Sequence, residues 1–115
     1  MFILFGVKIN SSKKVRYALK KLFGLGFSRA NTICNDLSIS NNTFIYDLTD
    51  LQKTKISTYI KNHFSVESKL KQQIFENIEN LKIINCVKGF RHRYKLPVRG
   101  QRTHSNAKTC KKLVR

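Results

Sequence analysis

The feature that most limits how this chain can fold is its C-terminal third, residues 80–115, which holds eleven Lys or Arg residues and no Asp or Glu. Each unpaired charge that is buried in a protein interior costs several kcal/mol. This segment therefore has to lie in water or against a polyanion. Nucleic acid offers the densest regular array of negative charge, so the segment predicts an extended tail that binds nucleic acid.

The charge of the whole chain is divided unevenly. The formal net charge is +17 over 115 residues, and residues 80–115 contribute +11 of it. Such an asymmetry is typical of an arm that contacts nucleic acid or a membrane. A membrane arm needs an amphipathic helix with large apolar residues opposite its charges. The tail has only scattered Phe90, Leu96 and Leu113, which favours nucleic acid.

Arginine is concentrated in one part of the tail. The chain has sixteen Lys and seven Arg, but residues 91–102 hold four Arg and one Lys. The planar guanidinium group of Arg can grip a phosphate through two hydrogen bonds and stack on bases, which Lys cannot do. The local enrichment in Arg within a Lys-rich chain therefore favours phosphate contact over a segment whose charge serves only solubility.

Hydrophobic spacing predicts four helices, over residues 13–23, 29–37, 49–64 and 67–81, and hence a mainly α fold. In helix order, the residues expected to face inward are Val15, Ala18, Leu19 and Leu22; Ala30, Ile33, Cys34 and Leu37; Leu51, Ile56, Tyr59 and Ile60; and Leu70, Ile74, Phe75, Ile78 and Leu81. No strong β-hairpin signal is present. We expect residues 1–81 to form a helical domain and residues 82–115 to form a basic RNA-binding tail.

The helix ends have recognisable signals. Ser28 is expected to be the N-cap of the second helix, and Thr49 with Gln52 fits a capping box at the start of the third. Gly89, Pro97 and Gly100 exclude a long helix in the tail. A short helical turn is possible around residues 86–93, and Thr103 is a candidate cap for another.

The turn between the first two helices is a second candidate site. Gly24 and Gly26 let the backbone turn tightly and approach another molecule closely, and the N-terminus of the following helix offers free N–H groups to a phosphate. Arg29 lies beside it, as do two neighbouring lysines. The alternative is a plain helix–helix turn, in which glycine is a common C-cap. The charge of the chain favours phosphate binding.

Catalysis and metal binding are not indicated. The six acidic residues are dispersed, and no nucleophile stands out beside a base. The three cysteines form no CxxC pair, so neither a zinc site nor a disulfide framework is expected. No apolar run approaches the roughly 18 to 20 residues of a membrane span. The sequence predicts a protein that is not an enzyme and needs no metal or other cofactor.

Two tail segments carry a resemblance to a known family. Residues 89–93 read Gly-Phe-Arg-His-Arg, and residues 96–103 read Leu-Pro-Val-Arg-Gly-Gln-Arg-Thr. Together with residues 106–109 and the Gly24–Gly26 turn, they resemble the universal small-subunit ribosomal protein thirteen family, from about Gly6 onward. The resemblance implies a helix-two-turns-helix module and a structural role in the head of the small ribosomal subunit.

The resemblance also implies partners. These are small-subunit rRNA, the head protein numbered nineteen, the large-subunit protein five and an RNA finger at inter-subunit bridges, and the peptidyl-site tRNA. From the residues and the resemblance together, the expected rRNA-binding positions are Lys20, Lys21, Gly24, Gly26, Ser28, Arg29, Lys88, Arg91, His92, Arg93, Lys95, Arg99, Gly100, Gln101, Arg102, Thr103, Asn106 and Lys108. The positions expected near tRNA are Lys111, Lys112 and Arg115.

The amino-acid composition of the chain and the sequence of its tail indicate the compartment in which the protein works. Phe, Ile, Asn, Lys and Tyr far outnumber Gly, Ala, Arg and Pro, which is the profile of an A+T-rich gene. The N-terminus does not look like a cleavable presequence, so either the protein is made where it works or a presequence is missing. Tyr94–Lys95 replaces the Arg–Gly that is usual in bacterial members. The sequence of residues 103–106 resembles that of mitochondrially encoded members. We expect a mitochondrion rather than a plastid or a bacterial cytoplasm.

Two other functions remain to be weighed. DNA glycosylases share the glycine-containing helical hairpin, so a DNA-binding repair module is the main alternative, although such enzymes also carry an N-terminal catalytic residue and usually a zinc finger. A free-standing RNA chaperone is the other.

Overall fold

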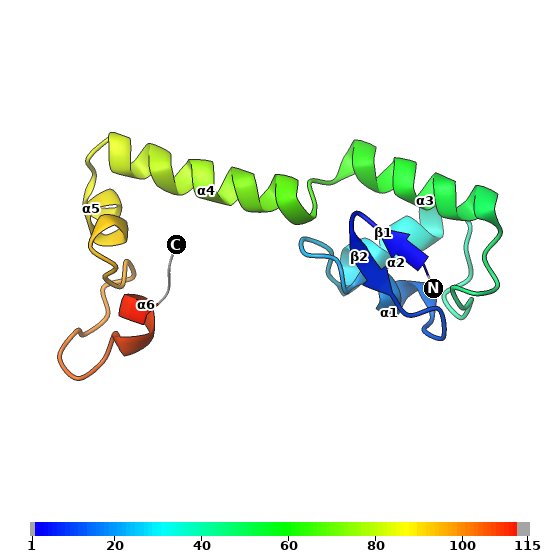
Figure 1. The fold of residues 1–115 in the computed structure, drawn as a ribbon, viewed down its shortest axis with the longest axis horizontal. Helices are drawn as coiled ribbons and strands as arrows, with labels where there is room; N and C mark the ends of the chain where they lie inside the picture. The colour runs from blue at the N-terminus through cyan, green and yellow to red at the C-terminus, as the bar shows by residue number, and fades with distance from the viewer. Residues whose placement is uncertain (1, 113–115) are drawn as a thin grey trace. The chain divides into compact units, whose positions relative to one another are not determined.

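The computed structural model describes residues 2–112 of the chain (Figure 1). These residues divide into two compact units, with the boundary between Leu70 and Lys71. The fold is mainly helical, as the sequence predicted. The elements in chain order are β1 (Phe2–Leu4), β2 (Val7–Ile9), α1 (Val15–Leu19), α2 (Phe27–Asp36), α3 (Asp50–His63), α4 (Glu67–Ile83), α5 (Val87–Arg93) and α6 (Lys108–Lys112). A functional boundary between residues 81 and 82 stays a prediction.

The N-terminus forms a β-hairpin, which was not predicted from the sequence. β1 and β2 pair antiparallel, with Phe2 opposite Ile9 and Leu4 opposite Val7. Phe5 and Gly6 connect them, and both have positive φ, 49° and 80°, as a type I′ turn requires. Phe is unusual at positive φ. The Phe5–Gly6 pair therefore does not match the Asn-Gly or Asp-Gly signal from which such a turn is predicted. The last residue of each strand is buried in the core.

Helices α1 and α2 both differ from the predicted ranges at their starts. α1 begins at Val15 rather than at residue 13, because Lys14 is extended and bridges to Phe44. It also ends earlier, at Leu19. The N-cap of α2 is Gly26 and not Ser28, which lies inside the first turn.

Helix α3 matches its prediction closely. The Thr49 hydroxyl accepts a hydrogen bond from the Gln52 amide at 3.3 Å, and the Thr49 amide donates to the Gln52 side chain at 3.1 Å, which completes the expected capping box. Ile56 and Ile60 are buried. Leu51, which was expected to face inward, is 76% exposed in the first turn, so that part of the prediction was wrong.

Helix α4 has the predicted extent at its start, but its apolar residues do not belong to a core. No residue of α4 is buried, and Ile74 and Phe75 are 43% and 53% exposed. The buried hydrophobic residues of the described chain run from Leu4 to Val66 and form one cluster in the first unit. The expectation that Ile74 and Phe75 face inward was therefore wrong. None of the described helices is both long enough and apolar enough to cross a membrane.

The tail contains two short helices. α5 lies where a helical turn was expected, and the Cys86 Sγ caps it by accepting from the Gly89 amide at 3.3 Å. α6 begins at Lys108, so Thr103 does not cap it. Residues 94–107 between them are outside regular helices.

Candidate nucleic-acid interface

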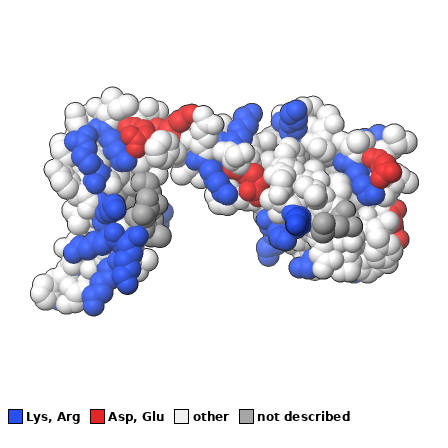
Figure 2. Space-filling view, viewed as in Figure 1, with Lys and Arg blue, Asp and Glu red and all other residues white. Residues whose placement is uncertain are grey.

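The basic side chains of the tail are almost all unpaired within the described chain. Figure 2 shows Lys and Arg gathered over the second unit around α5 and the segment that follows it. Lys82 pairs with Glu79 at 2.7 Å. Among the Lys and Arg residues of the described segment 83–112, only Arg93 has a hydrogen-bonded side chain. The predicted tail positions that are exposed are Lys88, Arg93, Lys95, Arg99, Gly100, Gln101, Arg102, Thr103, Asn106, Lys108, Lys111 and Lys112. Arg91 and His92 are half-buried, and Arg115 lies outside the described residues.

Arg93 anchors α5 to the end of α4. Its Nη2 donates to the Lys82 carbonyl at 3.1 Å and to the Asn85 side-chain oxygen at 3.3 Å. Its guanidinium carbon lies 5.5 Å from the centre of the Phe90 ring. A basic side chain that satisfies a carbonyl at a helix C-terminus stabilises that end. Arg93 therefore positions the tail as well as adding charge to it.

Gly89 allows α5 to pack directly on the backbone of α4. A Cβ built at this position would lie 2.1 Å from the Leu81 carbonyl oxygen. Gly89 was predicted to limit helix length in the tail and belongs to the family-like segment 89–93, but this contact was not predicted. A glycine within a helical stretch costs about 1 kcal/mol relative to Ala, and that cost is the signal that such a position has a packing reason.

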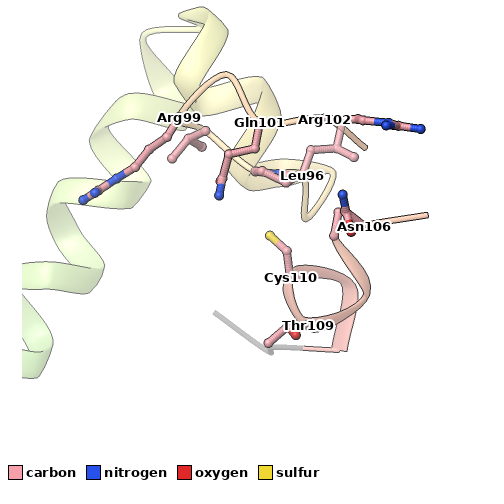
Figure 3. A pocket seen from close by; sticks show the side chains of 10 residues that line it. Leu96, Arg99, Gln101, Arg102, Asn106, Thr109 and Cys110 are labelled. Atoms are coloured by element: carbon pink, nitrogen blue, oxygen red, sulfur yellow. The ribbon is translucent and has the colours of Figure 1, made fainter. Parts of the chain in front are cut away.

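The segment after α5 folds back on itself. A cavity of about 450 Å³ lies between residues 96–102 and residues 106–110. Figure 3 shows Arg99 and Arg102 on the same loop with their guanidinium groups pointing in opposite directions, away from Cys110. Gly100 between them has φ of 69°, a conformation that favours glycine. The loop thus offers two separate guanidinium groups to two phosphates.

The turn between α1 and α2 is packed against its own chain. A Cβ at Gly24 would lie 2.7 Å from Leu70 Cδ2 and 3.1 Å from the Ser65 carbonyl oxygen. Arg29 Nη1 donates to the Gly24 carbonyl at 2.7 Å, and its guanidinium lies 5.4 Å from the centre of the Phe64 ring. The close approach that the sequence assigned to another molecule at Gly24 is made here by residues 65–70. RNA contact by Gly24 and Arg29 stays a prediction.

The start of α2 is open. Gly26 caps it without a side-chain hydrogen bond, a Cβ there would meet nothing within 4 Å, and Ser28 is exposed. Lys20 and Lys21 are also exposed, and Lys21 Nζ donates to the Lys8 carbonyl at 2.7 Å. These positions are accessible to a phosphate, and their role in RNA binding also stays a prediction.

Two pKa shifts in the first unit bear on catalysis. Burial raises the pKa of the Cys34 thiol above its ordinary 9.0, and a hydrogen bond to Asp36 raises the pKa of Tyr59 above 10.0. Both shifts move the titration further from neutral pH, where a general acid or base has to work. Within residues 2–112, no group of three or more His, Cys, Asp or Glu residues is placed to hold a metal ion.

A helical unit with its own core, followed by a basic segment without acidic residues, is the arrangement of a protein that binds nucleic acid. Comparison with known proteins makes the class specific. A family model described as "Ribosomal protein S13/S18" matches residues 3–109. The chain therefore belongs to this family of ribosomal proteins, as its tail segments indicated.

Individual relatives support the same assignment. "Small ribosomal subunit protein uS13m" of Marchantia polymorpha is 42% identical over 113 residues, which cover 98% of this chain and 94% of the relative. "Small ribosomal subunit protein uS13" of Thermosipho melanesiensis is 42% identical over 106 residues, covering 92% and 87%. The protein of that name from Thermotoga petrophila is 43% identical over 106 residues, covering 92% and 85%. The family is structural and not enzymatic, and no observation favours the DNA-repair alternative.

Proposed function

We propose that the chain is a structural component of a small ribosomal subunit and that its tail binds the rRNA of that subunit. The observation that carries this proposal is the set of exposed Arg and Lys side chains between Lys88 and Lys112, of which only Arg93 is hydrogen-bonded within the described chain. The names of the relatives from Marchantia, Thermosipho and Thermotoga support it. In this function the first unit gives the chain a stable fold and the tail takes its final contacts from RNA.

The role of the two loop arginines can be tested by a double substitution. Changing Arg99 and Arg102 to Ala removes two exposed cations and disturbs no buried contact, so we expect weaker binding to small-subunit rRNA with unchanged helicity. The plot of log affinity against log salt should become shallower by about 0.7 to 0.9 for each phosphate contact that is lost. Filter binding over a series of salt concentrations and circular dichroism provide the two measurements.

A matched control is available on α3. Lys55 and Lys61 are exposed lysines of the first unit, so changing both to Ala removes the same charge from a surface outside the tail. We expect this variant to bind rRNA more tightly than the Arg99/Arg102 variant does. Equal losses in the two variants would mean that only net charge matters and would overturn the assignment of the tail as the rRNA site.

The finer contacts are also part of the proposal. Within the subunit we place the chain in the head, beside the protein numbered nineteen, with bridge contacts to the large-subunit protein five and an RNA finger. Lys111 and Lys112 end the described tail with two exposed cations, which supports an approach to the peptidyl-site tRNA. Cross-linking in intact ribosomes, with a photoreactive group at position 111, tests this: labelling of tRNA is the expected result, and labelling of small-subunit rRNA alone would contradict it.

The proposed location is the mitochondrial ribosome. The relative from Marchantia is a mitochondrial ribosomal protein, and the A+T-rich composition agrees with an organellar gene. Bacterial relatives match almost as well, so the plastid and the bacterial cytoplasm remain the competing locations. Gradient fractionation of purified organelles tests this: recovery with the small subunit of mitochondria is expected, and recovery with plastid ribosomes alone would refute it.

A further inference from the structure

The first unit carries a cluster of aromatic and cationic side chains that the tail-centred function does not use. The guanidinium carbon of Arg16 lies 4.8 Å from the centre of the Tyr17 ring and 5.4 Å from that of the Phe27 ring. The two ring centres are 6.1 Å apart. Arg16 Nη2 also donates to the Tyr17 hydroxyl at 3.2 Å.

Both rings of this cluster face solvent. Tyr17 is 48% exposed and Phe27 is 43% exposed, although each has neighbours that hold it in place. Arg16 connects α1, which carries Tyr17, to the first residue of α2, which is Phe27. The cluster is therefore an aromatic surface whose orientation is fixed before any ligand arrives, which lowers the entropic cost of binding.

A cavity lined by lysines adjoins the cluster. It has a volume of about 450 Å³, and its lining includes Tyr17 together with Lys13, Lys20 and Lys21. A second hollow, of about 340 Å³, shares Lys21 with it and adds Lys8. No Asp or Glu lines either of them. Tyr17 thus belongs both to the aromatic cluster and to the wall of a cationic cavity.

We propose that Tyr17 and the adjoining lysines form a binding site for an unpaired nucleotide of RNA, with its phosphate in the cavity and its base stacked on the Tyr17 ring. Interleaved aromatic and basic side chains are typical of single-strand binding, because every base has a face that stacks and every nucleotide carries a phosphate. A base in a duplex has no free face to offer. The lysine lining, with no carboxylate, complements a phosphate.

This site rests on the proposed function but is separate from the tail. It lies entirely in the first unit, and it gives that unit an RNA contact that depends on base stacking and not on charge alone. It predicts that the rRNA segment facing α1 contains a bulged or looped-out nucleotide.

The test uses the full chain and a short single-stranded RNA that carries one 2-aminopurine, a fluorescent base whose emission is quenched when it stacks on an aromatic ring. We expect wild-type protein to quench the emission and Tyr17→Phe to retain the quenching. Tyr17→Leu, which keeps apolar volume but has no ring, should abolish the quenching and weaken binding about tenfold. The same RNA annealed into a duplex should show no dependence on residue 17.

Two further variants serve as a control and as an independent test of the cavity. Tyr46 is a 63% exposed tyrosine stacked on Phe44, and it does not line the lysine cavity, so Tyr46→Leu should leave the quenching unchanged. Changing Lys13 and Lys20 to Gln should weaken binding without affecting the fold, which thermal unfolding checks. If Tyr17→Leu loses stability, the Lys13/Lys20 variant still tests whether this site binds RNA.

The outcomes separate this site from the tail. Quenching that survives in both Tyr17→Leu and the Lys13/Lys20 variant overturns the site, whereas the proposed function fails only if wild-type protein does not bind RNA. Competition by free adenosine monophosphate at the affinity of the oligonucleotide would make this a mononucleotide site and refute the RNA assignment. Unchanged RNA binding with poorer incorporation of Tyr17→Leu into subunits would mean that a protein covers the cluster, which also refutes it.

Discussion

At the scale of single residues, Cys34 links the stability of the first unit to pH. Its side chain is fully buried in α2, and burial raises the pKa of its thiol above 9.0, opposed by the positive charge of Arg16. Because the folded state holds the proton more tightly than the unfolded state, the contribution of Cys34 is fully present below pH 9 and is lost as the pH rises through the folded-state pKa. We therefore expect the free energy of unfolding to fall as the pH rises above 9.

Urea unfolding at a series of pH values from 7 to 10 measures this effect. Cys34→Ala lacks the titrating thiol, so it should be less stable at pH 7 because of the cavity it leaves, yet its stability should fall less steeply above pH 9. A parallel alkylation experiment should label Cys86 and Cys110 before Cys34, since both are only half-buried. Identical pH slopes in the two proteins would contradict the prediction.

The roles of individual residues could be predicted where one physical cost dominates. The exposure of Arg99 and Arg102 follows from the cost of burying unpaired charge and does not depend on the rest of the fold. The role of Gly24 depends instead on what packs against it. Two glycines around an apolar residue allow a close approach by RNA or by the chain itself, and only the positions of Ser65 and Leu70 show that the chain fills this space.

At the scale of secondary-structure elements, the periodicity of α4 predicted a helix but not its surroundings. Apolar residues at helical spacing indicate a face that is suited to burial. In α4 that face is left open in the described chain, since Ile74 and Phe75 remain exposed. For the β1–β2 hairpin, the element itself was not predicted. Strands of three residues and a Phe5–Gly6 turn give too weak a sequence pattern to detect.

The junction of α4 and α5 depends on Gly89. In Gly89→Ala the new methyl group would overlap the Leu81 carbonyl, at 2.1 Å in the unrelaxed structure, so α5 has to move away from α4. Forced displacement of this kind costs about 2 kcal/mol. We expect faster hydrogen exchange at the amides of Phe90 and Tyr94, which donate to the carbonyls of Cys86 and Phe90 within α5, and weaker rRNA binding.

Val87→Ala is the matched control for this substitution. Val87 is in the same helix and is 77% exposed, so its truncation removes no packing contact and should leave exchange in α5 unchanged. If Gly89→Ala exchanged at the wild-type rate, the close packing of α5 on α4 would not hold in solution.

At the scale of the whole molecule, the hydrophobic core and the main concentration of exposed arginines lie in different parts of the chain. The hydrophobic core ends at Val66, whereas the exposed arginines of the tail begin at Arg93 and are concentrated before α6. This division could be predicted from the sequence, because apolar spacing and charge are segregated along it. Which nucleotides contact the tail could not be predicted, because those contacts depend on the sequence and fold of the RNA and not on the chain alone.

This division predicts two different responses to trypsin. In the free protein we expect the first cuts after Arg99 and Arg102, which are exposed and outside helices, because cleavage needs an accessible backbone that can open locally. Lys55 and Lys61 are also exposed but lie within α3, so cleavage after them should be slower and report on unfolding of the first unit. Mass spectrometry of the fragments over time gives both rates.

In assembled small subunits the cuts after Arg99 and Arg102 should disappear, because rRNA then surrounds the loop. Cleavage there at the rate of the free protein would show that the tail remains in solvent after assembly, and its charge would then need another partner.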